Sequence, residues 1–219
     1  MPTGEEVAAA WRIASPAAVH PELDAQGQPV SSGSAETTMR QLVGAIREYS
    51  DFDPPDLVLL DYGGGPGRIA RLAAGLFHRV IVADTNPAYL EIAADIPEVE
   101  TLLVDTTPSE LPDLGNDIDV ILCINVFLHL PVRTAISLLR LFADTIPADG
   151  LIALQIPLYD RATTPDTWTS VGTWTENQLR SRVAGAGLVV RELHTNRGVY
   201  VPGSHPGANH ARLHILGRP

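Results

Sequence analysis

The sequence contains no lysine, so all 15 of its basic residues are arginines. Without lysine the chain cannot form a Schiff base with a carbonyl compound. The same absence excludes a phosphate-binding loop of the type that ends in lysine. A compositional bias of the source genome explains the missing lysine most simply, and we infer no function from the absence itself.

Cysteine is also scarce, because Cys123 is the only one. A single cysteine excludes an internal disulfide and any zinc site built from several cysteines. Cys123 stands in an apolar run, so we expect a buried and inert thiol. Positive charge is scarce too, since 15 basic residues oppose 26 acidic ones and the formal net charge is -11. Such a field repels a phosphate backbone on average, so we do not expect nucleic acid as a partner.

Long hydrophobic runs are absent, since no stretch of 18 apolar residues occurs in the sequence. The first residues also lack the basic start and apolar stretch of a signal peptide. We therefore expect a soluble, cytoplasmic protein with no membrane partner. Its 219 residues suffice for one α/β domain with a full core.

Short apolar runs alternate with amphipathic helical segments from residue 56 onward. This pattern predicts a doubly wound, Rossmann-like α/β fold with a mostly parallel sheet covered on both faces. The last strand follows a loop rather than a helix, so we expect it to be antiparallel. The expected strands are residues 57–60, 80–83, 99–104, 118–124, 151–156, 188–193 and 211–216, and the expected helices are 68–77, 87–95, 132–146 and 176–186.

The first 50 residues are less apolar than the rest and contain helical patterns at residues 4–14 and 34–49. Fifty residues with this composition are too few for an independent domain. We therefore predict an N-terminal helical cap over residues 1–50, packed beside a ligand-binding domain over residues 51–219.

A glycine-rich turn is the sharpest feature of the sequence. Directly between the first expected strand and its helix stands Asp61-Tyr62-Gly63-Gly64-Gly65-Pro66-Gly67. Glycines permit positive φ angles and a close approach of the backbone to a ligand. The helix behind points its free N–H groups at whatever lies there. The alternative is an ordinary tight turn, and the run from Gly65 to Ala70 also fits the dinucleotide-binding fingerprint.

Acidic residues follow three successive expected strands, as Asp61, Asp84 and Asp105. An acid after the second strand can accept both hydroxyls of a ribose, and Asp105 with its neighbour Thr106 can bind an exocyclic amine. Each acid alone could be a helix cap or a solvated loop residue, but three at one edge favour a ligand. Asp61 would repel a pyrophosphate, which argues against a nicotinamide-dependent oxidoreductase.

These segments resemble the class I S-adenosylmethionine-dependent methyltransferases of the small-molecule type. The resemblance is carried by LVLLDYGGGPGRIARLA, VIVADTNPAYLEIA, LLVDTTPSELP and DIDVILCINVFLHLP, and it covers residues 57–156 well. It implies S-adenosylmethionine as the cofactor, with its methionine part at Asp61, its ribose at Asp84 and its adenine amine at Asp105.

The same resemblance implies that Gly63, Gly65 and Gly67 lie along the cofactor. Asn125, directly after the fourth expected strand, is the remaining candidate cofactor-binding residue.

Three histidines are candidate general bases. His129 follows the fourth strand, and His205 and His210 stand in the loop that precedes the last strand. A base is needed only if the nucleophile must lose a proton. The alternative for His129 is a packing role or a place beside the cofactor. His205 and His210 could bind a metal, but no acid lies between them and their spacing is not specific, so we expect no metal.

Two polar loops, residues 157–174 and 196–210, should reach the same edge of the sheet. Their candidate substrate-binding residues are Tyr159, Trp168, Arg197 and Tyr200. The alternative is a pair of solvated loops with aromatic anchors.

The predicted function is methyl transfer from S-adenosylmethionine to an oxygen, nitrogen or carbon nucleophile of a small molecule. A secondary metabolite is suggested by analogy with the family alone. The chain has neither the Asn-Pro-Pro-aromatic run nor the Pro-Cys pair of enzymes that methylate DNA bases. The alternative is a non-methylating or cofactor-binding protein on the same fold. The oligomeric state stays open, with a homodimer as the first assembly to test.

Overall fold

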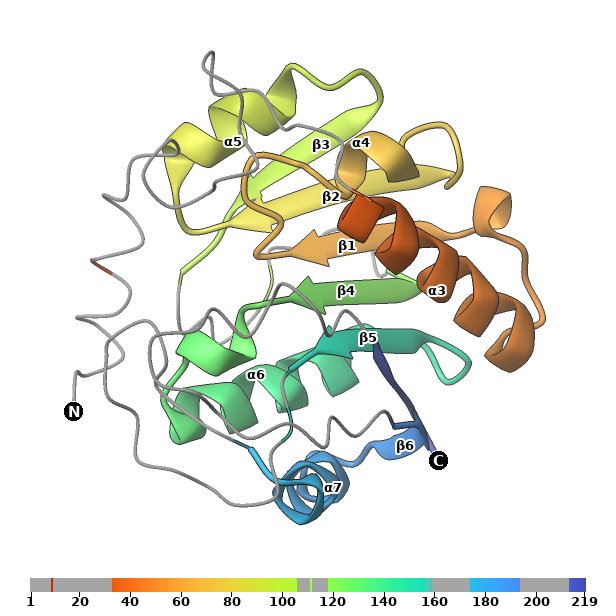
Figure 1. Ribbon diagram of the computed structural model, residues 1–219, viewed down its shortest axis with the longest axis vertical. Helices are drawn as coiled ribbons and strands as arrows, with labels where there is room; N and C mark the ends of the chain where they lie inside the picture. The colour runs from red at the N-terminus through yellow and green to blue at the C-terminus, as the bar shows by residue number, and fades with distance from the viewer. Residues whose placement is uncertain are drawn as a thin grey trace.

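The computed structural model describes residue 9 and residues 33–105, 111, 118–156, 158, 174–193 and 213–219, and every structural statement below refers to these residues. They form a seven-stranded sheet with the order β3-β2-β1-β4-β5-β7-β6 (Figure 1). Its strands are β1 (Val58–Tyr62), β2 (Arg79–Asp84), β3 (Val99–Leu103), β4 (Val120–Ile124), β5 (Leu151–Gln155), β6 (Val189–Glu192) and β7 (His214–Gly217).

The sheet is parallel except at its last strand. β1 pairs in parallel with β2 and β4, β2 with β3, and β4 with β5. β7 lies between β5 and β6 and is antiparallel to both. The prediction of a mostly parallel, Rossmann-like sheet with an antiparallel final strand is therefore confirmed. Because the parallel strands end on the same side, their last residues form one edge, which we call the carboxyl edge.

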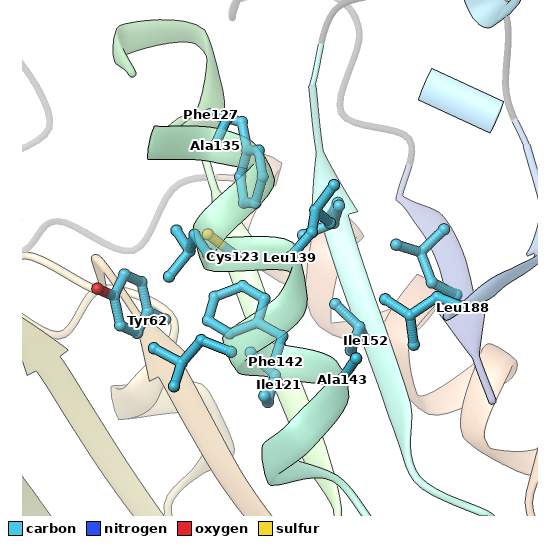
Figure 2. Packing of buried hydrophobic residues seen from close by; sticks show 14 of the residues in the cluster. Tyr62, Ile121, Cys123, Phe127, Ala135, Leu139, Phe142, Ala143, Ile152 and Leu188 are labelled. Atoms are coloured by element: carbon cyan, nitrogen blue, oxygen red, sulfur yellow. The ribbon is translucent and has the colours of Figure 1, made fainter. Parts of the chain in front are cut away.

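Two hydrophobic clusters cover the two faces of the sheet. One cluster packs α6 (Val132–Thr145) and α7 (Glu176–Gly185) against one face. Figure 2 shows its centre, where Phe142 of α6 lies beside Tyr62 and Cys123. The second cluster packs α3 (Gly33–Tyr49), α4 (Ala70–Ala73) and α5 (Pro87–Ala94) against the other face.

Two of the expected elements differ from the structure. The helix expected over residues 68–77 is regular only over Ala70–Ala73. Gly67 (φ 81°) and Gly75 (φ 75°) adopt left-handed conformations on either side of α4, and such conformations break helical geometry. The strand expected to be covered on both faces at residues 99–104 is the exposed edge strand β3, where Leu103 is 60% exposed. Hydrophobic composition alone does not tell a central strand from an edge strand.

α3 forms part of the core, at the front of the sheet in Figure 1. Met39, Leu42 and Ile46 point inward at helical spacing and pack in the cluster that contains Val120 and Ala153 of the sheet. The side-chain carbonyl of Gln41 also accepts a hydrogen bond from the backbone N–H of Leu213, just before β7 (3.1 Å). The expected boundary at residue 50 stays a prediction, and most of the expected helix at residues 4–14 lies outside the described residues. None of the described helices has the length and hydrophobicity needed to cross a bilayer.

We predict that Leu42→Ala lowers the free energy of unfolding by about 2–5 kcal/mol, the usual range for a leucine lost from a core. Leu42 is 1% exposed, so its removal leaves a cavity between α3 and the sheet. Urea unfolding measures the effect, with Arg40→Ala on the exposed side of the same helix as the control. A loss below about 1 kcal/mol would mean that α3 is only loosely attached.

Candidate functional site

The carboxyl edge brings the acids of β1 and β2 together. Asp61 is the fourth residue of β1, and Asp84 is the last residue of β2. The pairing of Tyr62 with Ala83 sets the two strand ends side by side. Asp84 is close enough to influence Asp61, because its negative charge contributes to raising the pKa of Asp61.

The glycine loop, which we define as Gly63–Gly67, connects β1 to α4 across this edge. Gly63, Gly65 and Gly67 have φ angles of 73°, 56° and 81°, a conformation that favours glycine. The backbone N–H groups of Gly63 and Gly64 both donate to the carbonyl oxygen of Ala83, at 2.7 and 3.3 Å. The loop is therefore tied to the end of β2 by its own backbone.

Asp84 strengthens that connection with its side chain. Its Oδ2 accepts a hydrogen bond from the N–H of Gly65, and its Oδ1 accepts one from the N–H of Asn86, each at 2.9 Å. Asn86 in turn caps α5, because its side chain accepts from the N–H of Ala88. Burial raises the pKa of Asp84, and these N–H donors oppose the rise. The carboxylate thus has a fixed orientation between the loop and α5.

Asp61 lies beneath the glycine loop and is 2% exposed. A Cβ at Gly64 would stand 2.7 Å from the carboxyl carbon of Asp61, so only glycine leaves room for this acid. Its Oδ2 is buried and makes no hydrogen bond to any described residue. Burial raises the pKa of Asp61 to about 7, Arg68 opposes the rise, and Asp84 adds to it. A buried carboxylate oxygen without a described hydrogen-bond partner suits a cationic ligand.

Two tyrosines beside Asp84 were missed by the sequence analysis. Tyr62 and Tyr89 are both buried, and burial raises the pKa of each hydroxyl group, in Tyr89 to about 12. The charge of Asp84 adds to both shifts, and that of Asp105 adds to the shift of Tyr62. Tyr62 is part of the glycine-rich turn, next to Gly63. This position was the only feature of the sequence that could have pointed to it.

The turn after β4 reaches the same edge. Asn125 is exposed and has a φ angle of 57°, which is uncommon for any residue other than glycine. A short 3-10 helix, Phe127–His129, follows, and the N–H of His129 donates to the carbonyl oxygen of Val126 (2.9 Å). His129 is half-buried at the end of this helix. Strained backbone of this kind is often found at functional sites.

Packing within the fold leaves no room for a side chain at Gly67. A Cβ there would stand 2.5 Å from Cδ1 of Ile96 and 3.3 Å from the Cβ of Ala93. Gly67 therefore lets α4 approach the end of α5 closely, and its expected contact with the cofactor stays a prediction.

The structure brings together only some of the expected site residues. Asp61, Asp84 and the glycine loop lie together at the carboxyl edge, Asn125 and His129 follow β4 at that edge, and Asp105 is exposed just beyond β3. The remaining expected residues lie outside the described ones, and they are Thr106, Tyr159, Trp168, Arg197, Tyr200, His205 and His210.

Other groups of interest lie away from this site or are inert. Cys123 is buried as expected, and burial raises the pKa of its thiol. Among the described residues no three His, Cys, Asp or Glu side chains are grouped to hold a metal ion. A small hollow lies at the opposite, amino-terminal edge of the sheet and is lined in part by Ser50, Phe52, Asp119 and Gly150.

Comparison with known proteins identifies the class. A family model described as a methyltransferase domain matches residues 35–193. The chain therefore belongs to this family, the class I S-adenosylmethionine-dependent methyltransferases. A search of curated protein sequences finds no match.

Solved structures of the same fold include three methyltransferases. CalS10 is described as an amino pentose methyltransferase from Micromonospora echinaspora, solved with S-adenosylmethionine (TM-score 0.65, 16% identity, covering 86% of this chain and 92% of that one). The sugar N-methyltransferase KedS8 from Streptoalloteichus has a TM-score of 0.61 and 14% identity, with 85% and 87% covered. The magnesium protoporphyrin IX methyltransferase from Synechocystis has a TM-score of 0.59 and 18% identity, with 85% and 80% covered.

The residues at the carboxyl edge fit S-adenosylmethionine. Asp84 is held in place and retains lone pairs for ribose hydroxyl groups. Asp61 has a buried oxygen without a described partner, and the cofactor carries a cationic amine that can neutralise this carboxylate directly or through water.

We predict that Asp61→Asn stabilises the protein without its cofactor. The pKa of Asp61 is higher in the folded state than in the unfolded state. The free energy of unfolding therefore decreases as the pH rises from about 4 to about 7. The pKa shift corresponds to about 4 kcal/mol at pH 8, and burial of the asparagine amide offsets part of it. The variant should therefore gain about 2 kcal/mol of unfolding free energy at pH 8, and most of the gain should disappear at pH 4.

Chemical unfolding at both pH values tests this expectation. Asp119→Asn is the control, because Asp119 is half-buried and its carboxylate already accepts a hydrogen bond from the N–H of Val58 (2.8 Å). Equal stability of Asp61→Asn and the unchanged protein at pH 8 would contradict the prediction.

Proposed function

We propose that this protein transfers the methyl group of S-adenosylmethionine to an oxygen, nitrogen or carbon nucleophile of a small molecule. The observation that carries the proposal is the buried Oδ2 of Asp61, which has no described hydrogen-bond partner and lies near the fixed carboxylate of Asp84. The structural relatives described above act on an amino pentose, a sugar and a magnesium porphyrin, all of them small molecules. A small secondary metabolite is therefore the substrate class to test first.

The cofactor supplies an electrophilic methyl group bound to a sulfonium centre. In the proposed site, the carboxylate of Asp84 accepts hydrogen bonds from the ribose hydroxyl groups. Asp61 neutralises the charge of the methionine amine, and Asp105 faces the adenine amine. The glycine loop presents its backbone to the ligand, because its left-handed glycines allow a tight turn at the end of β1. Alignment of nucleophile, methyl carbon and sulfur then provides most of the rate.

His129 is the proposed general base. It lies one turn beyond Asn125, on the segment that follows β4 at the carboxyl edge. Its imidazole can accept the proton of a hydroxyl nucleophile during methyl transfer, or the proton of an ammonium group before the neutral amine attacks. A nucleophile that arrives without an acidic proton needs no such base.

We predict that S-adenosylhomocysteine binds more tightly as pH rises from 6 to 8, by up to about 10-fold, because ionised Asp61 attracts the ligand's ammonium group. The pKa of about 7 places the transition within this range. Calorimetry measures the affinity. Asp61→Asn should bind more weakly at pH 8 and lose most of the pH dependence, and a flat profile for the unchanged protein would contradict the role of Asp61.

We also predict that His129→Ala lowers the methylation rate at least about 100-fold while the affinity for S-adenosylhomocysteine changes little. A panel of amino sugars, phenols and carboxylic acids, assayed by formation of S-adenosylhomocysteine, identifies a usable substrate. A near-normal rate would assign His129 a packing role. Cofactor binding without turnover of any compound would favour the non-methylating alternative.

A further inference from the structure

The turn after β4 fills the space that a side chain at Gly63 would need. If Gly63 carried a Cβ, that atom would collide with Cγ2 of Val126, and the Cβ and Cγ1 of Val126 would stand 3.6 and 3.8 Å away. Val126 thus packs directly on the first residue of the glycine loop. The contact joins two adjacent strand ends, because β1 and β4 pair in parallel.

The residue after Val126 anchors this turn in the core. Phe127 is fully buried, and its ring centre lies 6.2 Å from that of Phe142 and 6.1 Å from that of Trp174. Phe142 also makes an edge-on contact with Tyr62 (5.1 Å), the residue before Gly63 (Figure 2). Both sides of the Val126 contact are therefore supported by the same aromatic cluster.

The backbone on both sides of the contact is unusual. Gly63 has a φ angle of 73°, and Asn125, next to Val126, has one of 57°. Asparagine adopts the left-handed conformation more readily than most residues with a side chain, but the conformation still costs free energy, which packing of its neighbours can offset. The close fit of Val126 against Gly63 constrains both segments, since each blocks the movement of the other.

We propose that Val126 is a positioning residue of the cofactor site, whose side chain holds the glycine loop in its binding conformation. This inference rests on the proposed function, because it concerns the loop that receives S-adenosylmethionine. The turn after β4 would thus affect cofactor binding indirectly, by supporting the glycine loop from the side of the core. The effects of substitutions at Val126 and Gly63 on binding should then depend on each other.

A double-mutant cycle in the full chain tests the proposal, with S-adenosylhomocysteine affinity measured by calorimetry. Val126→Ala alone should weaken binding about 5- to 10-fold, because the loop loses its support. Gly63→Ala alone should weaken it at least about 30-fold, since the new methyl group meets Val126. In the Gly63→Ala background, Val126→Ala should strengthen binding about 5-fold, because it removes the colliding carbons.

Two control variants separate positioning from general stability. Val126→Thr keeps a branched side chain of the same shape and should bind within about 2-fold of the unchanged protein. Val183→Ala removes the same atoms from a core site in α7 and should lower the melting temperature while leaving the affinity unchanged. Melting temperatures of all variants, measured without ligand, show that each one is folded.

We expect Val126→Ala to weaken S-adenosylhomocysteine binding when residue 63 is glycine and to strengthen it in the Gly63→Ala variant. If Val126→Ala changes the affinity by the same factor with Gly63 and with alanine at position 63, the proposal is overturned while the proposed function stands. If Val126→Ala lowers only the melting temperature, as Val183→Ala does, the role of Val126 is packing alone and the proposal is also overturned. Failure of the unchanged protein to bind S-adenosylhomocysteine would overturn the proposed function, and the inference with it.

Discussion

The hydrogen bonds to the carboxylate of Asp84 are the interactions on which the site depends. One comes from Gly65 and one from Asn86, so a single side chain joins the glycine loop, the end of β2 and the start of α5. These bonds orient the carboxylate of Asp84 before any ligand binds. Its remaining lone pairs can accept hydrogen bonds from a ligand without a change in side-chain conformation. The site is therefore built on the ends of rigid elements.

Asp61 represents a conflict between folding and ligand binding. Its carboxyl group is buried beneath Gly64 without a hydrogen bond from Oδ2 to any described residue, which is unfavourable for the protein alone. The proposed cofactor brings the positive charge that this position lacks. Residues that serve a ligand at the expense of stability are common at functional sites. In the proposed site, the same carboxyl group would make cofactor binding sensitive to pH near neutrality.

Much of the site was predictable because its signals are local in the sequence. Asp61 and Asp84 stand directly after apolar runs, at the carboxyl ends of β1 and β2, and parallel strands bring these ends to one edge. The extent of α4 was not predictable, since the glycines on either side of it adopt left-handed conformations that composition does not reveal. The contact of Val126 with Gly63 was missed because it joins residues far apart in the chain.

The class of fold, the antiparallel last strand and the family could be predicted from the chain's amino acids, because hydrophobic periodicity and a short motif are properties of neighbouring residues. Three features became apparent only in the folded chain: β3 is an exposed edge, α3 belongs to the core, and Oδ2 of Asp61 is buried without a described partner. The contact of Val126 with Gly63 is a fourth such feature. Burial, pKa and steric fit depend on which distant residues pack together, and no local pattern in a single chain encodes them.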